Sequence, residues 1–139
     1  MFFHPEHLQE GRVTFFQKVQ IARAWSIRGN DDVQWRLILT LNALRNEIAH
    51  GGKSEKRSRQ ITELRKILPE IGNESFRKDV EAADDKHTIV LTAAKCSGFL
   101  LELKADLIAL RTHIDDLDEK RNPDAPRVRM PPHLKDDDN

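Results

Sequence analysis

The amino-acid sequence predicts an all-α protein, an up-and-down bundle of four to five helices with one long C-terminal helix. Apolar residues recur with the period of a helix, and no stretch alternates apolar and polar residues for long enough to form a strand. The six glycines and six prolines lie mostly between the periodic segments rather than inside them. A chain of 139 residues is long enough for one domain with a core of its own.

The first periodic segment predicts a helix from about residue 13 to residue 28. Gly29 and Asn30 follow it as a stop signal, and Asp31 or Asp32 can cap the next helix by accepting its free N–H groups. The apolar face of this first helix comprises Phe15, Val19 and Ala22, broadened by Phe16, Ile21 and Trp25.

A second helix is expected from about residue 33 to residue 50, where Gly51 and Gly52 end it. This helix is apolar on two opposite sides and therefore has two neighbours to pack against. We expect it to be central in the bundle or shared with a second subunit. One side carries Leu37, Leu41, Leu44 and Ile48, and the other carries Trp35, Leu39 and Ala43 together with Asn46 and His50.

Residues 53–59 are expected to form a polar, basic connection. A third helix follows from about residue 57 to residue 68 and stops near Pro69, and a short helix then starts at Asn73 or Ser75. The third helix presents Ile61, Leu64 and Leu68 to the core, and the short one presents Phe76 and Val80.

The last helix carries the most regular apolar pattern of the chain. Its apolar residues are separated alternately by four and three positions without interruption, which forms a long seam along one side of the helix. The seam packs within the bundle, or part of it pairs with the same helix of another protomer. The pattern ends at Arg121, so we divide the chain into an N-terminal arm (1–11), a helical bundle (12–120) and a mobile polar tail (121–139). The seam consists of Ile89, Ala93, Cys96, Leu100, Leu103, Leu107, Leu110, Ile114 and Leu117.

The composition limits the class of protein. Lysine plus arginine equals aspartate plus glutamate at 23 each, and this zero net charge argues against a dedicated binder of duplex DNA. The start of the chain has no signal-peptide pattern and no apolar stretch is long enough to span a bilayer, so we expect a soluble cytoplasmic protein. We find no motif for a metal or a cofactor and predict none.

The single cysteine, Cys96, is expected to be a small buried hydrophobic residue.

Arg45, Asn46 and His50 are the candidate catalytic residues. His50 ends the second helix, where the helix dipole favours a charged imidazolium, and Asn46 lies one turn earlier, placed to hydrogen-bond the ring. Arg45 lies about 140° around the helix from His50, but its long side chain can reach the same cleft. A proton-transferring group beside a cation suits phosphodiester cleavage without a metal. The alternative is that Arg45 and His50 only cap the helix by neutralising its last carbonyls.

The run from Arg45 to Gly51, Arg-Asn-Glu-Ile-Ala-His-Gly, resembles the Arg-polar-x-x-x-His signature that ends a helix in the all-α HEPN superfamily. The segment 16–25, Phe-Gln-Lys-Val-Gln-Ile-Ala-Arg-Ala-Trp, is similar to the helix that precedes this signature in the branch around the mannitol operon repressor. The resemblance covers about residues 15–51, and beyond them it extends to Leu117 only as general helical architecture.

The resemblance implies a bundle that commonly forms a homodimer, in which the Arg and His of two protomers face a shared cleft and cleave RNA without a metal. On this basis Arg45 stabilises the scissile phosphate, Asn46 orients His50, and His50 is the general acid and base. The alternative is a non-catalytic module of the mannitol-repressor type that binds RNA or a regulatory protein partner. The toxin branch whose motif carries a modified tyrosine is disfavoured, because that position is Gly52 and the chain has no tyrosine.

A cluster of basic residues flanks the motif. Between Arg45 and Lys66 there are seven lysines and arginines against three glutamates, a local charge of +4. Such a cluster suits a polyanion such as RNA, whose binding weakens steeply with salt, although it is also typical of an ordinary solvated loop. The candidate nucleic-acid contacts are Lys53, Lys56, Arg57 and Arg59.

Overall fold

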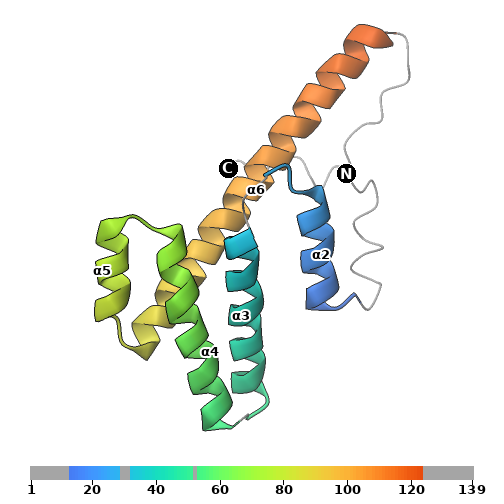
Figure 1. The fold of residues 1–139 in the computed structure, drawn as a ribbon. Helices are drawn as coiled ribbons and strands as arrows, with labels where there is room; N and C mark the ends of the chain where they lie inside the picture. The colour runs from blue at the N-terminus through green and yellow to red at the C-terminus, as the bar shows by residue number, and fades with distance from the viewer. Residues whose placement is uncertain (1–12, 29–31, 52, 124–139) are drawn as a thin grey trace, which may run out of the picture. The chain divides into compact units, whose positions relative to one another are not determined.

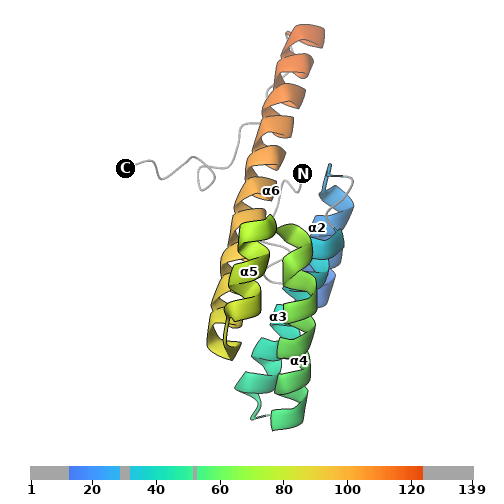
Figure 2. The same cartoon turned by 60° about the vertical axis from the view of Figure 1, so that its left-hand side comes forward.

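The computed structural model describes residues 13–28, 32–51 and 53–123, and the regular structure in these ranges is entirely helical. Consecutive helices alternate in direction (Figure 1, Figure 2), so the predicted all-α bundle is confirmed. The predicted arm (1–11) and most of the predicted tail lie outside the described residues. The elements are α2 (Phe15–Trp25), α3 (Asp32–Ala49), α4 (Ser54–Ile67), the 3-10 helix η1 (Leu68–Ile71), α5 (Glu74–Ala82) and α6 (Asp85–Arg121).

The chain divides after Leu107 into a first unit that holds the core and a second unit that begins at Ile108. In the first unit α3 is central, as its two apolar sides predict. Trp35 on one side of α3 packs edge to face on Phe99 of α6, with ring centroids 4.9 Å apart and an interplanar angle of 88°. The buried apolar side chains are Val19, Trp35, Leu37, Ile38, Leu44, Leu64, Ile67, Leu68, Val80, Cys96, Phe99 and Leu103.

Three helices begin at residues whose side chains satisfy the free N–H groups of the first turn. Thr14 and Gln17 form a reciprocal capping box, so α2 starts at Phe15, and it ends at Trp25, within the predicted range 13–28. The Asn73 side chain accepts a hydrogen bond from the Phe76 N–H at 2.9 Å, as expected for the cap of α5. The Asp84 carboxylate accepts from the His87 N–H at 2.7 Å at the start of α6, and this bond and the adjacent His87 ring lower the pKa of Asp84.

The prediction of a polar connection over residues 53–59 was wrong, because α4 already begins at Ser54. No glycine or proline interrupts this stretch, and Glu55 lies in the first turn, where the helix dipole favours a negative charge. Lys56 Nζ lies 3.5 Å from Glu47 Oε1 and so links the first turn of α4 to the last turn of α3. As a result α3 and α4 form a helical hairpin with a turn of only a few residues. The predicted stop near Pro69 is the point where α4 gives way to η1.

The packed face of α6 differs from the predicted seam. Ala93 and Leu100, two seam residues, are exposed, whereas two threonines outside the seam are fully buried. The hydroxyls of Thr88 and Thr92 donate to the carbonyls of Asp84 and Thr88, at 2.8 and 2.7 Å, so the helix itself satisfies them. With their polar groups satisfied, the threonines can face the core. The buried stripe therefore consists of Thr88, Thr92, Cys96, Phe99 and Leu103.

A matched pair of leucine substitutions tests which face of the bundle is packed. Leu64 is 0% exposed and Leu101 is 68% exposed. We expect Leu64→Ala to lower the free energy of unfolding by about 2–5 kcal/mol, because it leaves a cavity in the core. Leu101→Ala should change it by no more than about 0.5 kcal/mol. Urea denaturation followed by circular dichroism measures both values, and equal losses would contradict the packing described.

Candidate functional site

The Arg-Asn-x-x-x-His motif lies at the end of α3, where the backbone itself terminates the helix. The His50 N–H donates to the Asn46 carbonyl at 3.0 Å, and the Gly51 N–H donates to the Ile48 carbonyl at 3.3 Å. Gly51 has a φ of 64°, the left-handed conformation that glycine adopts readily at helix ends. The carbonyls at the end of α3 thus find backbone donors.

The side chains of Arg45, Asn46 and His50 are all exposed. Within the described ranges, none of the three makes a side-chain hydrogen bond or an ion pair. The expected bond from Asn46 to the His50 ring is therefore not formed in this structure, because both side chains face solvent. In this structure neither Arg45 nor His50 donates a side-chain hydrogen bond to a carbonyl of α3.

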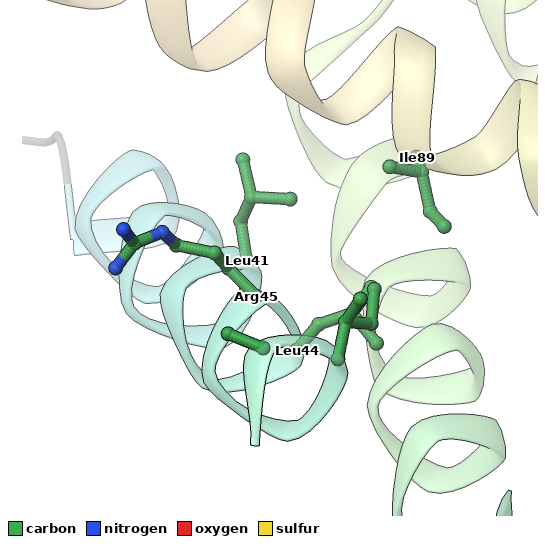
Figure 3. Close-up of a pocket in the computed structure, with 6 residues that line it drawn as sticks. Leu41, Leu44, Arg45 and Ile89 are labelled. Carbon is green, nitrogen blue, oxygen red and sulfur yellow. The ribbon is translucent and has the colours of Figure 1, made fainter. Parts of the chain in front are cut away.

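Arg45 borders an open pocket of about 240 Å³ between α3 and the start of α6 (Figure 3). Arg45 is the one charged residue among those that line the pocket, but its side chain extends along α3 away from Ile89, so its guanidinium points away from the pocket. Asn46 and His50 do not line this pocket. A single chain therefore brings Arg45 to the pocket but leaves its predicted partners on another side of the helix end. The lining residues are Leu41, Leu44, Arg45, Ile48, Ala49 and Ile89.

Some residues of the basic cluster interact with other side chains of the protein, and others are exposed without an ion pair. Of the four predicted nucleic-acid contacts, Lys56 pairs with Glu47, and Arg57 is half-buried and interacts with the protein. Lys53 and Arg59 are exposed and have no ion pair with any residue that the structure describes. The site therefore presents Arg45, His50, Lys53 and Arg59 to solvent around the α3–α4 hairpin turn.

The neighbouring cations are held by the bundle. The Arg65 guanidinium contacts Asp85 Oδ1 at 2.9 Å and the Ala83 carbonyl at 2.9 Å, which fixes α4 to the start of α6. Lys66 Nζ lies 3.9 Å from Glu63. Glu63 lies within the stretch whose charge was counted from the sequence, whereas Asp85, the partner of Arg65, lies 20 residues along the chain and only the fold brings it close.

The single cysteine is the other reactive side chain considered in the described chain. Cys96 is buried as predicted, and burial raises the pKa of its thiol to about 11, which makes the reactive thiolate rare at neutral pH. No cluster of three or more metal-ligating side chains occurs within residues 13–28, 32–51 and 53–123. Over the same ranges, no helix has the length and apolar character needed to cross a membrane.

No protein-family model matches this chain, and neither a curated protein nor a solved structure matches it. The interpretation of the site therefore depends on its own residues and on their geometry.

Substitutions at the end of α3 distinguish a capping role from a functional one. Gly51→Ala places a side chain in the left-handed conformation, where no neighbour lies within 4 Å of the new Cβ, so only backbone strain is added. We expect it to lower the free energy of unfolding by about 1–2 kcal/mol. His50→Ala removes no side-chain hydrogen bond or ion pair to a described residue and should change stability by no more than about 0.5 kcal/mol. Chemical denaturation measures both, and a larger loss for His50→Ala would support the capping account.

Proposed function

We propose that this protein binds RNA at the α3–α4 hairpin turn and acts as a homodimeric, metal-independent endoribonuclease that uses Arg45 and His50. One observation carries the proposal. The chain has no net charge, yet four basic side chains close in sequence to the α3–α4 turn are exposed and make no ion pair or side-chain hydrogen bond with a described residue. They are Arg45, His50, Lys53 and Arg59. Exposed cations that the fold does not use are suited to bind phosphates, and the imidazole beside them is suited to transfer protons. The resemblance to the HEPN signature supports the same assignment.

The proposed reaction is a transesterification that cuts the RNA chain, after which the two fragments are released. His50 takes the proton of a ribose 2′-OH, whose oxygen attacks the adjacent phosphorus while the bond from phosphorus to O5′ breaks. The imidazolium so formed returns the proton to O5′. The products are a 2′,3′-cyclic phosphate and a free 5′-hydroxyl. Arg45 stabilises the negative charge that builds on the phosphoryl oxygens, and Asn46, one turn before His50, would orient the ring when RNA is bound.

The homodimer is part of this proposal for a geometric reason. In one chain Arg45 is among the residues that line the α3–α6 pocket, and His50 is not. A second copy can supply His50 to the Arg45 of the first, and by two-fold symmetry the reverse. Each cleft would then contain residues from both chains.

Cleavage of an unstructured RNA in EDTA tests the activity. We expect wild-type protein to produce cyclic phosphate ends, and Arg45→Ala and His50→Ala to lower the rate by about 100-fold or more, as losses of charge stabilisation and of proton transfer do. His113→Ala, which removes another exposed histidine, is the matched control and should leave the rate unchanged. Circular dichroism checks that each variant is folded. RNA binding without cleavage would instead support the non-catalytic module.

Mixing the two inactive variants tests the shared cleft. A mixed dimer of Arg45→Ala and His50→Ala chains has one cleft with both native residues, so random mixing should restore about one quarter of the wild-type rate. If Arg45 and His50 act within one chain, mixing restores nothing. The assay thus separates a dimeric site from a monomeric one.

Salt dependence tests the proposed RNA-binding surface. Removing both Lys53 and Arg59 should weaken RNA binding and lower the slope of log affinity against log salt by about 0.7 for each phosphate that the variant no longer neutralises. The control is the double variant Lys104→Ala/Lys120→Ala, which removes two exposed lysines outside the hairpin turn. Fluorescence anisotropy with a labelled single-stranded RNA measures the slopes. Equal slopes for both double variants would place the RNA elsewhere.

A further inference from the structure

Glu47 lies inside the Arg-Asn-x-x-x-His motif and has two cations within reach. Its Oε1 lies 3.5 Å from Lys56 Nζ at the start of α4. The other cation is the protonated form of His50, which follows Glu47 by three residues. The His50 N–H still donates to the Asn46 carbonyl, at 3.0 Å, so the helical path continues to His50. Residues three apart on a helix are neighbours on one face, which places the Glu47 carboxylate beside the His50 ring.

The two partners of this ion pair differ in their access to solvent. The Glu47 side chain is 26% exposed, whereas the Lys56 side chain is 62% exposed. An RNA phosphate can therefore bind Lys56 but cannot replace Glu47 as a carboxylate. A carboxylate that is largely withdrawn from water is costly without a cation. When RNA takes Lys56, the neighbour that can neutralise Glu47 is the imidazolium of His50.

We propose that Glu47 is a positioning residue for His50 and that RNA binding transfers it from Lys56 to His50. Glu47 then accepts a hydrogen bond from the ring nitrogen that faces away from the ribose 2′-OH. The carboxylate fixes the tautomer of the ring and stabilises the imidazolium while His50 carries the proton, and it takes up no proton itself. Asn46 can hold the ring but has no charge with which to stabilise the imidazolium. The role in cleavage rests on the proposed function, whereas the contact itself is measured without RNA.

The other charged groups of the elements around the end of α3 do not provide this partner. Both aspartates at the start of α6 are already bound to other side chains of the protein. Glu55 is exposed and lies about 100° around α4 from Lys56, so it is the matched control for Glu47. The remaining groups are cations or the bound histidine of α6. The full set is Arg45 on α3, Lys53, Glu55 and Arg57 at the start of α4, and Asp84, Asp85, Lys86 and His87 at the start of α6.

An NMR titration of the His50 ring in the full, RNA-free protein tests the contact. Lys56→Met frees the Glu47 carboxylate and should raise the pH midpoint of the ring by several tenths of a pH unit, because a nearby negative charge favours the imidazolium. Glu47→Gln should lower the midpoint and remove most of the effect of Lys56→Met. Glu55→Gln should leave the midpoint in place. No rise after Lys56→Met, or an equal rise with and without the Glu47 carboxylate, would overturn the proposal.

The pH dependence of RNA cleavage tests the positioning role. Glu47→Gln should move the acid limb of the kcat profile to lower pH, because His50 then loses its proton more readily, and should lower kcat about tenfold or more. Glu47→Asp keeps the charge and should restore part of the rate. Lys56→Met should instead raise KM, because it removes a phosphate contact. A loss of kcat in Glu47→Gln with an unchanged pH profile would show that Glu47 is only structural.

The two experiments separate failure of this inference from failure of the proposed function. If the His50 midpoint shifts as expected and no protein cleaves RNA, the contact between Glu47 and His50 stands and the proposed function fails. If cleavage depends on His50 but the midpoint does not respond to Glu47, the proposed function stands and the inference fails.

Discussion

The burial of α3 on two sides is the constraint on which the rest of the structure depends. Trp35 packs on Phe99 of α6, while Leu37 and Leu44 face the remaining core of the bundle. The buried residues of α3 are Trp35, Leu37, Ile38 and Leu44, so its last turn lies beyond the buried part of the helix. Arg45 and His50 are exposed there, where the helix ends beside a short turn.

Charge pairing decides which cations remain available in a protein without net charge. Arg65 joins α4 to the start of α6, and Lys56 joins α4 to α3 through Glu47. Exposed pairs of this kind add little stability individually, but each holds a cation in one place and neutralises it. Among the cations without an ion pair in the described chain, Lys53 and Arg59 lie close in sequence to Arg45 at the α3–α4 hairpin, whereas Lys104 and Lys120 lie on α6. A local positive surface therefore arises without any excess of basic residues in the whole chain.

The pocket beside α3 is an apolar surface that only folding completes. Leu41 and Leu44 come from α3, and Ile89 comes from α6. Ile48 of the same lining is 53% exposed. The Arg45 side chain extends along α3 away from Ile89 (Figure 3), so the apolar lining and the guanidinium face different directions.

The sequence by itself determined the helical class. It also limited α3 to a central or a subunit-shared place and the start of α5 to Asn73 or Ser75, and the structure shows Asn73 as the cap. Periodicity and local capping carry this information, because both depend on neighbours within a few residues. Only the tertiary structure decided that Thr88 and Thr92 face the core while Ala93 and Leu100 are exposed, because the buried face of α6 is set by the helices packed against it. The hydrogen bonds of the two threonine hydroxyls within the helix permit this burial. It also left Lys53 and Arg59 without an ion pair to a described residue, while Lys56 pairs with Glu47. It further placed Arg45, but not His50, among the residues that line the pocket completed by Ile89. These outcomes depend on contacts between residues distant in the chain, which no local pattern records.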